Sequence, residues 1–164
     1  MKTKTITLYN YDELSPKAYE KAYHDWYEQE EDPLMQSHMI NLLTEKLDER
    51  GIKYDTDSID VRYSLSYCHG DGFMFIGNVT WHGETVTVTH NDHYYCHMYT
   101  AGIETGDLKS EYVDSFKAMY QEVCKEMERI GYDHIESITS EEAFKEACDL
   151  NEWTFREDGT MENA

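Results

Sequence analysis

The longest run of alternating apolar and polar residues lies between Ile59 and Thr89. Apolar residues occupy every second position in three successive segments, and glycine-containing turns separate these segments. Such alternation is typical of strands with one buried face. The pattern predicts an antiparallel meander, and it places the tightest loop at His69-Gly70-Asp71-Gly72.

Two proline-containing signals on the N-terminal side of the meander predict helices. Ser15-Pro16 combines an N-cap residue with proline at the first helical position, and an apolar stripe at helical spacing follows it. Asp32-Pro33 repeats the signal, and Gly51 ends the second predicted helix as a left-handed cap. The acidic segment Glu28–Asp32 lies between the two helices.

The C-terminal part of the chain predicts two more helices. The longest begins at Asp107 or Ser110 and ends at Gly131. Thr139 and Glu142 form a capping box, which predicts a short fourth helix to about residue 149.

Further strands are predicted on both sides of the meander. Lys2–Tyr9 and Tyr94–Thr100 have strand patterns, Gly102–Gly106 is predicted to be a loop, and Asn151–Met161 is predicted to form a hairpin around Asp158-Gly159. The whole pattern predicts one α+β domain, residues 1–164, with an antiparallel sheet of four to five strands and helices packed on one face.

The charge of the chain restricts its partners. It has 14 basic and 34 acidic residues, for a formal net charge of −20, and half of that net charge lies in residues 107–164. Such a field repels nucleic acid and anionic membranes and attracts basic protein surfaces. The 22 aromatic residues favour a folded chain over a disordered one.

No export signal or membrane span is expected. The N-terminus lacks a basic region followed by an apolar run, and no apolar segment approaches the roughly 18–20 residues of a transmembrane helix. We therefore expect the four cysteines to be reduced thiols in a cytoplasm.

Clustered carboxylates suggest a partner-binding surface. Glu28, Glu30, Glu31 and Asp32 crowd a helix junction, and Glu122 and Glu126 repel each other at i,i+4 on the longest helix. Rows of carboxylates on helices can resemble a nucleic-acid backbone, which carries one charge per ~1.7 Å of duplex axis. A chain of this kind would bind the basic channel of a nuclease or DNA-binding protein. The alternative is that its acidic residues serve only to keep the protein soluble.

Histidine and cysteine density in the centre suggests metal chemistry as a second hypothesis. His90, His93 and His97 are closely spaced near Cys68 and Cys96, and zinc favours such ligands. On a strand, however, neighbouring side chains point to opposite faces, so we predict no bound metal.

The loop at His69–Gly72 has a second possible use. His69 and Asp71 are suited to acid–base chemistry, alone or with His90 or His93 on a metal, and glycines allow close approach to a ligand. The alternative is a hairpin loop, which also suits a partner contact. No P-loop, dinucleotide fingerprint or G-x-S-x-G motif occurs, so we expect no cofactor.

Three segments, in order, resemble a family of small uncharacterised proteins of tailed bacteriophages. Tyr11–Ser15 with Ala18 and Lys21-Ala22 resembles its F-D-E-L-S…A…K-A start, Tyr63–Phe75 resembles its Y-S-G-F-x-S-Q-G-D-G-A-x-F segment, and Asn151–Gly159 resembles its closing N-x-Y-x-F-x-E-D-G hairpin. His69 stands where the family has Gln, and Phe73 where it has Ala.

The resemblance implies a phage accessory protein in a bacterial cytoplasm and supplies no catalytic residue. Small acidic phage proteins often inhibit host nucleases, restriction or CRISPR systems, which agrees with the charge. The leading hypothesis is thus a non-enzymatic inhibitor that binds a basic surface through the carboxylate clusters and His69 and Asp71. The alternatives are a metal-dependent enzyme and an oligomeric regulatory module that assembles through an exposed sheet face.

Overall fold

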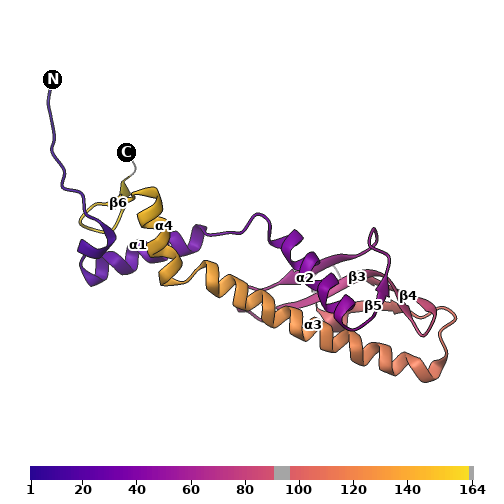
Figure 1. Cartoon of the computed structure of the whole chain (residues 1–164). Coiled ribbons are helices and arrows are strands. Elements are labelled where there is room, and N and C mark those ends of the chain that lie inside the picture. The colour runs from indigo at the N-terminus through magenta and orange to yellow at the C-terminus, as the bar shows by residue number, and fades with distance from the viewer. Residues whose placement is uncertain (91–96, 163–164) are drawn as a thin grey trace. The chain divides into compact units, whose positions relative to one another are not determined.

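The computed structural model describes residues 1–90 and 97–162, and their contacts divide the chain into two compact units (Figure 1). The central unit is Pro33–Asp133. The terminal unit joins Met1–Asp32 to His134–Ala164. The sequence predicts one domain, whereas the contacts of the chain form these two units.

The central unit contains the predicted meander, and the α+β fold class is confirmed. Strands β2 (Asp60–Ser64), β3 (Gly72–Trp81) and β4 (Glu84–His90) follow one another, and β1 (Lys53–Tyr54) and β5 (Ala101–Glu104) complete a five-stranded sheet. Its order is β1-β3-β4-β5, with β2 also paired to β3, and every pairing is antiparallel.

Two helices cover the apolar face of this sheet. They are α2 (Met35–Glu49) and α3 (Ser110–Ile138), of which α3 continues into the terminal unit after Asp133. Alternate β3 residues face the helices because a strand has period two. The fully buried side chains of this core include Met39, Leu43, Leu47, Val61, Phe75, Val86, Phe116, Val123 and Met127.

The Tyr120 side chain ties α3 to the sheet. Its hydroxyl donates to the carbonyl oxygen of Phe75 at 2.8 Å and accepts from the Phe75 N–H at 3.1 Å. Burial raises the pKa of Tyr120 far above its ordinary value, and burial likewise raises the pKa of the nearby Cys124 thiol to about 12. Both groups are therefore neutral parts of the core.

The prediction that His69–Gly72 is the tightest loop is wrong. β3 and β4 are joined by the two-residue turn His82-Gly83, whose φ angles of 48° and 81° are both left-handed, as in a type I′ hairpin. The connection from β2 to β3 is longer, because β2 already ends at Ser64.

Two further predictions are wrong, the end of the long helix at Gly131 and the strand at Tyr94–Thr100. The helix continues through Gly131, where a β-carbon would lie 2.4 Å from Cδ1 of Leu65, so this glycine permits close packing instead of ending the helix. Of the strand predicted at Tyr94–Thr100, the described part forms a bend and a 3-10 turn, η2 (Met98–Thr100). The strand β5 begins directly after it, at Ala101, and extends into the segment Gly102–Gly106 that was predicted as a loop.

Two predictions for the first 35 residues are also wrong. Lys2–Tyr9 forms no strand, and only Tyr9 makes an isolated bridge, to Phe155. The second helix starts at Met35 with Leu34 at its N-cap, so the predicted Asp32 cap is wrong, and Leu34 is 69 % exposed.

The terminal unit consists of two helices and a hairpin. After a short 3-10 turn, η1 (Tyr11–Glu13), come α1 (Pro16–Gln29), α4 (Glu141–Asn151) and the strands β6 (Thr154–Phe155) and β7 (Met161–Glu162). The Ser15 cap is confirmed, since its side chain accepts from the Ala18 N–H, whereas α4 is capped by Ser140 instead of Thr139. The buried residues of this smaller core are Ala22, Trp26, Phe144, Cys148 and Phe155.

The predicted hairpin around Asp158-Gly159 is confirmed and packs against α1, but it starts later than predicted, because Asn151 still belongs to α4. Gly159 has φ 93°, and a β-carbon there would lie 2.2 Å from the backbone oxygen of Ala18. Only glycine fits this contact.

Candidate interface for a basic partner

The Asp71 carboxylate holds the loop between β2 and β3. It accepts hydrogen bonds from the Tyr132 hydroxyl on α3, from the Ser66 N–H at 3.1 Å and from the Cys68 N–H at 3.3 Å. The side chains of Ser64, Ser66 and Cys68 also donate to it, at 3.2–3.4 Å. Asp71 therefore fixes the loop to the helix.

These donors determine the protonation state of Asp71. Burial alone would raise the pKa of this carboxyl, but the hydrogen bonds from Tyr132 and from Ser66 and Cys68 outweigh it and hold the pKa well below its ordinary range. An aspartate that stays ionised and is surrounded by donors of its own loop is poorly suited to donate a proton at neutral pH.

His69 lies in the same loop as Asp71, and its side chain is exposed. No group of three or more His, Cys, Asp or Glu side chains in residues 1–90 and 97–162 is arranged to hold a metal ion. His93 and Cys96 lie outside the described residues, and so does the first part of the strand predicted at Tyr94–Thr100.

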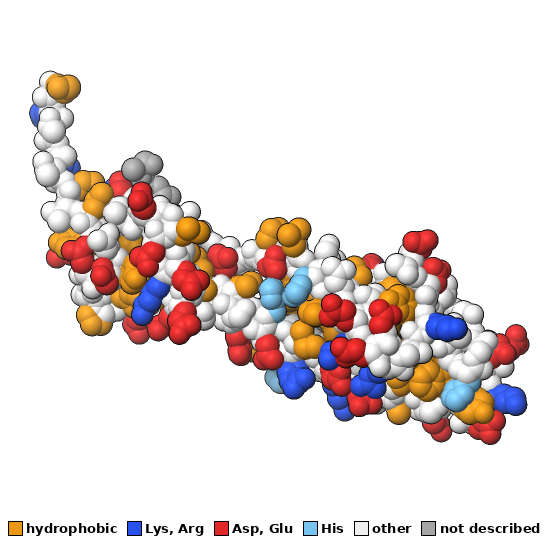
Figure 2. Space-filling view, in the orientation of Figure 1, with side chains coloured by type: hydrophobic (Ala, Val, Ile, Leu, Met, Phe, Trp, Pro, Cys, Tyr) orange, Lys and Arg blue, Asp and Glu red, His pale blue; other side chains and the backbone are white. Residues whose placement is uncertain are grey.

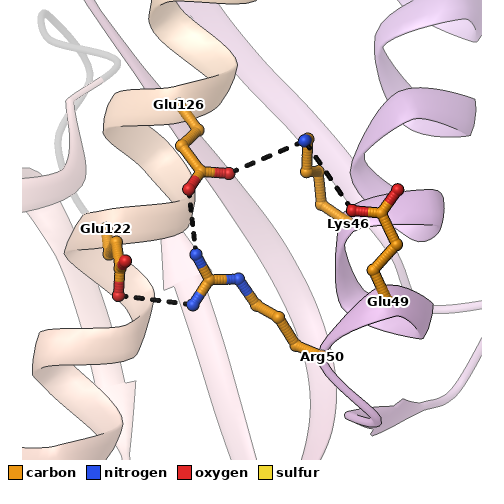
Figure 3. A network of polar contacts seen from close by, with 5 residues as sticks. All are labelled: Lys46, Glu49, Arg50, Glu122 and Glu126. Carbon is orange, nitrogen blue, oxygen red and sulfur yellow. Dashed lines mark hydrogen bonds and ion pairs between the residues drawn. The ribbon is translucent and has the colours of Figure 1, made fainter.

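Glu122 and Glu126 have intramolecular partners (Figure 3). Arg50, after α2, places its two terminal nitrogens 3.3 Å from Glu122 and 3.0 Å from Glu126. Lys46 lies between Glu126 at 3.9 Å and Glu49 at 3.8 Å. The sequence shows only two like charges on one helix face, whereas in the structure both carboxylates pair with basic side chains of the α2 region and so join α3 to α2.

The carboxylates at the end of α1 differ from this pair. Glu28 lies 3.1 Å from the Nε2 atom of exposed His24, and Asp32 lies 2.8 Å from Nε2 of His134. Glu30 and Glu31 are exposed, and neither has an ion-pair partner among the described residues. The cluster at residues 28–32 therefore has more unpaired negative charge than the pair Glu122 and Glu126.

Acidic residues are concentrated on the terminal unit. This unit has 17 acidic and 6 basic residues in 63 positions, whereas the central unit has 17 and 8 in 101 positions. Carboxylates cover the visible outer surfaces of α1 and α4, with few basic side chains between them (Figure 2). The exposed carboxylates of α4 are Glu141, Glu142, Glu146 and Asp149.

Two hollows in the terminal unit combine aromatic walls with carboxylates. The aromatic hollow, about 480 Å³, lies between α1 and the hairpin and is lined by residues that include Asp25, Trp26, Glu30, Trp153 and Phe155. The Tyr11 hollow, about 400 Å³, lies beside the C-terminal end of α4 and is lined by residues that include Tyr11, Asp12, Asp149, Glu152 and Trp153.

Trp153 lines both hollows, and no sequence pattern marks it as a site residue. The chain turns at Glu152, which ends α4 with a left-handed φ of 53° and directs the next residue toward α1. No local pattern reveals this, because the hollows form only when the hairpin, α1 and η1 come together.

No protein-family model, curated protein or solved structure matches the chain. Among the residues that the structure describes, no helix is long and apolar enough to cross a membrane.

Proposed function

We propose that this chain is a phage-encoded accessory protein that binds and inhibits a basic, nucleic-acid-binding host protein. The inhibition would be of the anti-CRISPR or anti-restriction type, with the acidic surface in the place of a nucleic-acid backbone, in the bacterial cytoplasm. The observation that carries the proposal is the excess of acid in the terminal unit, with 17 acidic against 6 basic residues.

The two predicted clusters contribute differently to this proposal. Glu28 lies in the last turn of α1, Glu30 and Glu31 follow its end, and all three are exposed to a partner. Glu122 and Glu126 are already paired with Arg50 and Lys46, so part of their charge is neutralised within the chain. We therefore assign the main contact to the terminal unit. The Asp71 loop, with exposed His69, is a secondary contact surface.

The contact is expected to be electrostatic in its rate and its salt dependence. Opposite charges speed the encounter, and the effect is screened within about 10 Å at 0.1 M salt. Aromatic side chains near the centre of such a contact would then prolong its lifetime.

Affinity capture followed by measurement with the purified partner tests the proposal. The immobilised chain is exposed to a bacterial lysate at about 50 mM salt and eluted at about 200 mM. We expect a nucleic-acid-binding protein to elute, and duplex DNA to compete with the chain for that purified protein. Binding that persists in salt and is indifferent to DNA would contradict the proposal.

Charge reversal locates the contact. The triple variant E28K/E30K/E31K is expected to weaken binding of the purified partner at least about tenfold. The matched control is E45K/E84K/E104K, which changes the net charge equally at three exposed positions of the central unit. Equal losses in both variants would show that only the overall field matters and would exclude a patterned interface.

A further inference from the structure

The aromatic hollow of the terminal unit has the composition of a site for a cationic side chain. Trp26 and Trp153 supply indole rings, and Asp25 and Glu30 supply carboxylates beside them. Cations are attracted to the faces of aromatic rings, most strongly to indole, and carboxylates add direct attraction. An anionic ligand would be repelled by the two carboxylates.

The walls of the hollow are held in place by the fold. Trp26 is buried at 7 % exposure and packs on Phe144 at 5.3 Å between ring centres. On the opposite wall, Phe155 exchanges two backbone hydrogen bonds with Tyr9, both 2.8 Å. The close contact of Gly159 with Ala18 fixes the hairpin against α1. The hollow is thus preorganised, which lowers the cost of binding.

A cation of the chain itself already lies at the rim. The ammonium of Lys21 is 2.9 Å from Asp25 and 3.4 Å from the hydroxyl of Thr160, and both of these residues line the hollow. Lys21 and Asp25 are each about half exposed, so the pair is weak and exchangeable. The rim therefore accepts a positive charge in the unliganded chain.

We propose that the aromatic hollow binds an arginine side chain presented by the basic partner. This inference rests on the proposed function and names the group of the partner that the terminal unit recognises. A guanidinium group is planar, so it can stack on the indole of Trp153 while its N–H groups donate to Asp25 and Glu30. Stacking and forked donation together favour arginine over lysine.

Titration with short peptides tests the inference without a known partner. Acetylated Gly-Arg-Gly amide is added to the ¹⁵N-labelled chain, and the indole N–H signals are followed by NMR. We expect the signals of Trp26 and Trp153 to move and that of Trp81, in the central unit, to stay. The neutral citrulline peptide should bind at least about tenfold more weakly, and the lysine peptide should bind more weakly than the arginine peptide.

Variants separate the hollow from the general field. D25N/E30Q is expected to weaken binding of the arginine peptide at least about fivefold. The matched control E84Q/D107N removes two carboxylates beside Tyr112 in the central unit and should leave the affinity unchanged. K21M removes the internal competitor and should strengthen binding severalfold. Equal binding of citrulline, tighter binding of lysine, or loss of affinity in K21M would each overturn the inference.

The partner protein distinguishes this inference from the proposed function. W153L retains every charge, and we expect its affinity for the purified partner to fall at least about fivefold. If W153L binds the partner normally while E28K/E30K/E31K does not, the arginine site is wrong and the electrostatic function stands. If neither variant changes binding, both are wrong. Thermal unfolding of W153L at the wild-type temperature reports that its fold is intact, and K21M provides the test if it is not.

Discussion

The Asp71 carboxylate is ionised and is surrounded by donors from its own loop and from α3. The sequence shows an aspartate between two glycines, which suits a turn and a catalytic group equally well. The donors decide between these uses, and Tyr132 lies 61 residues away in the chain, so no local pattern contains it. Glu122 and Glu126 gave the same difficulty, because Arg50 becomes their neighbour only when α2 packs beside α3.

Removal of the Asp71 charge is expected to destabilise the central unit. D71N keeps the size of the side chain but loses an ionised acceptor, and we expect the free energy of unfolding to fall by about 1–3 kcal/mol at pH 7. D55N is the matched control, since the Asp55 side chain accepts from one backbone N–H, of Asp57, and it should cost less than about 1 kcal/mol. Denaturant unfolding at pH 7 measures both.

The pH dependence of the same variant follows from the lowered pKa of Asp71. A carboxyl whose pKa is lower in the folded chain contributes stability that is present above its unfolded pKa, near 3.9, and is lost as pH falls toward the folded pKa. The difference between wild type and D71N should therefore be constant from pH 5 to 7 and shrink below about pH 4. A difference that grows on acidification would contradict this role for Asp71.

At the scale of elements, predictions succeeded where the local chemistry and the packing agree. The Ser15-Pro16 start of α1, the alternation of β2 to β4 and the Asp158-Gly159 hairpin each satisfy local preference and burial together. They failed where packing overrides a local signal. Gly131 looks like a helix end, yet it lies inside α3 because Leu65 needs the space.

Gly159 provides a stability test at this scale. G159A combines an unfavourable left-handed φ with a clash against the α1 backbone, so we expect the terminal unit to lose at least about 2–3 kcal/mol. The matched control is G51A, where φ is also left-handed, at 68°, and no atom lies within 4 Å of the added carbon. It should cost about 1 kcal/mol.

Thermal unfolding of both variants, with hydrogen exchange to assign the unit affected, measures this difference. Equal costs for the two glycines would show that the hairpin can move away from α1. The aromatic hollow would then lose the fixed wall on which its preorganisation depends.

At the scale of the whole molecule, the sequence predicts the sign and size of the charge but not its distribution. The acidic segment at residues 28–32 was predicted as a candidate site. The separation into carboxylates paired with Arg50 and carboxylates without an ion-pair partner among the described residues, such as Glu30 and Glu31, depends on which helices are neighbours. The hollows around Trp153 were missed for the same reason, because three segments from both ends of the chain build them.

The charge distribution predicts unequal local stability. The terminal unit has 11 excess negative charges on 63 residues. In the part of the chain that the structure describes, its buried core has five residues, whereas the central core has 19. Like-charge repulsion opposes compaction, and a small hydrophobic core offsets this repulsion less effectively than a large one. We therefore expect backbone amides of α1 and α4 to exchange faster than those of β3 and α3 within the central unit.

Salt should reduce this inequality. Raising ionic strength from about 0.01 M to about 0.1 M shortens the screening length from about 30 Å to about 10 Å, which weakens repulsion among the exposed carboxylates of α1 and α4. Hydrogen exchange followed by mass spectrometry at both salts, with an unstructured reference peptide to correct the intrinsic rates, should show slower exchange mainly in the terminal unit. Equal slowing in both units would mean that the repulsion is spread evenly over the chain, and the assignment of the partner contact to the terminal unit would lose its physical basis.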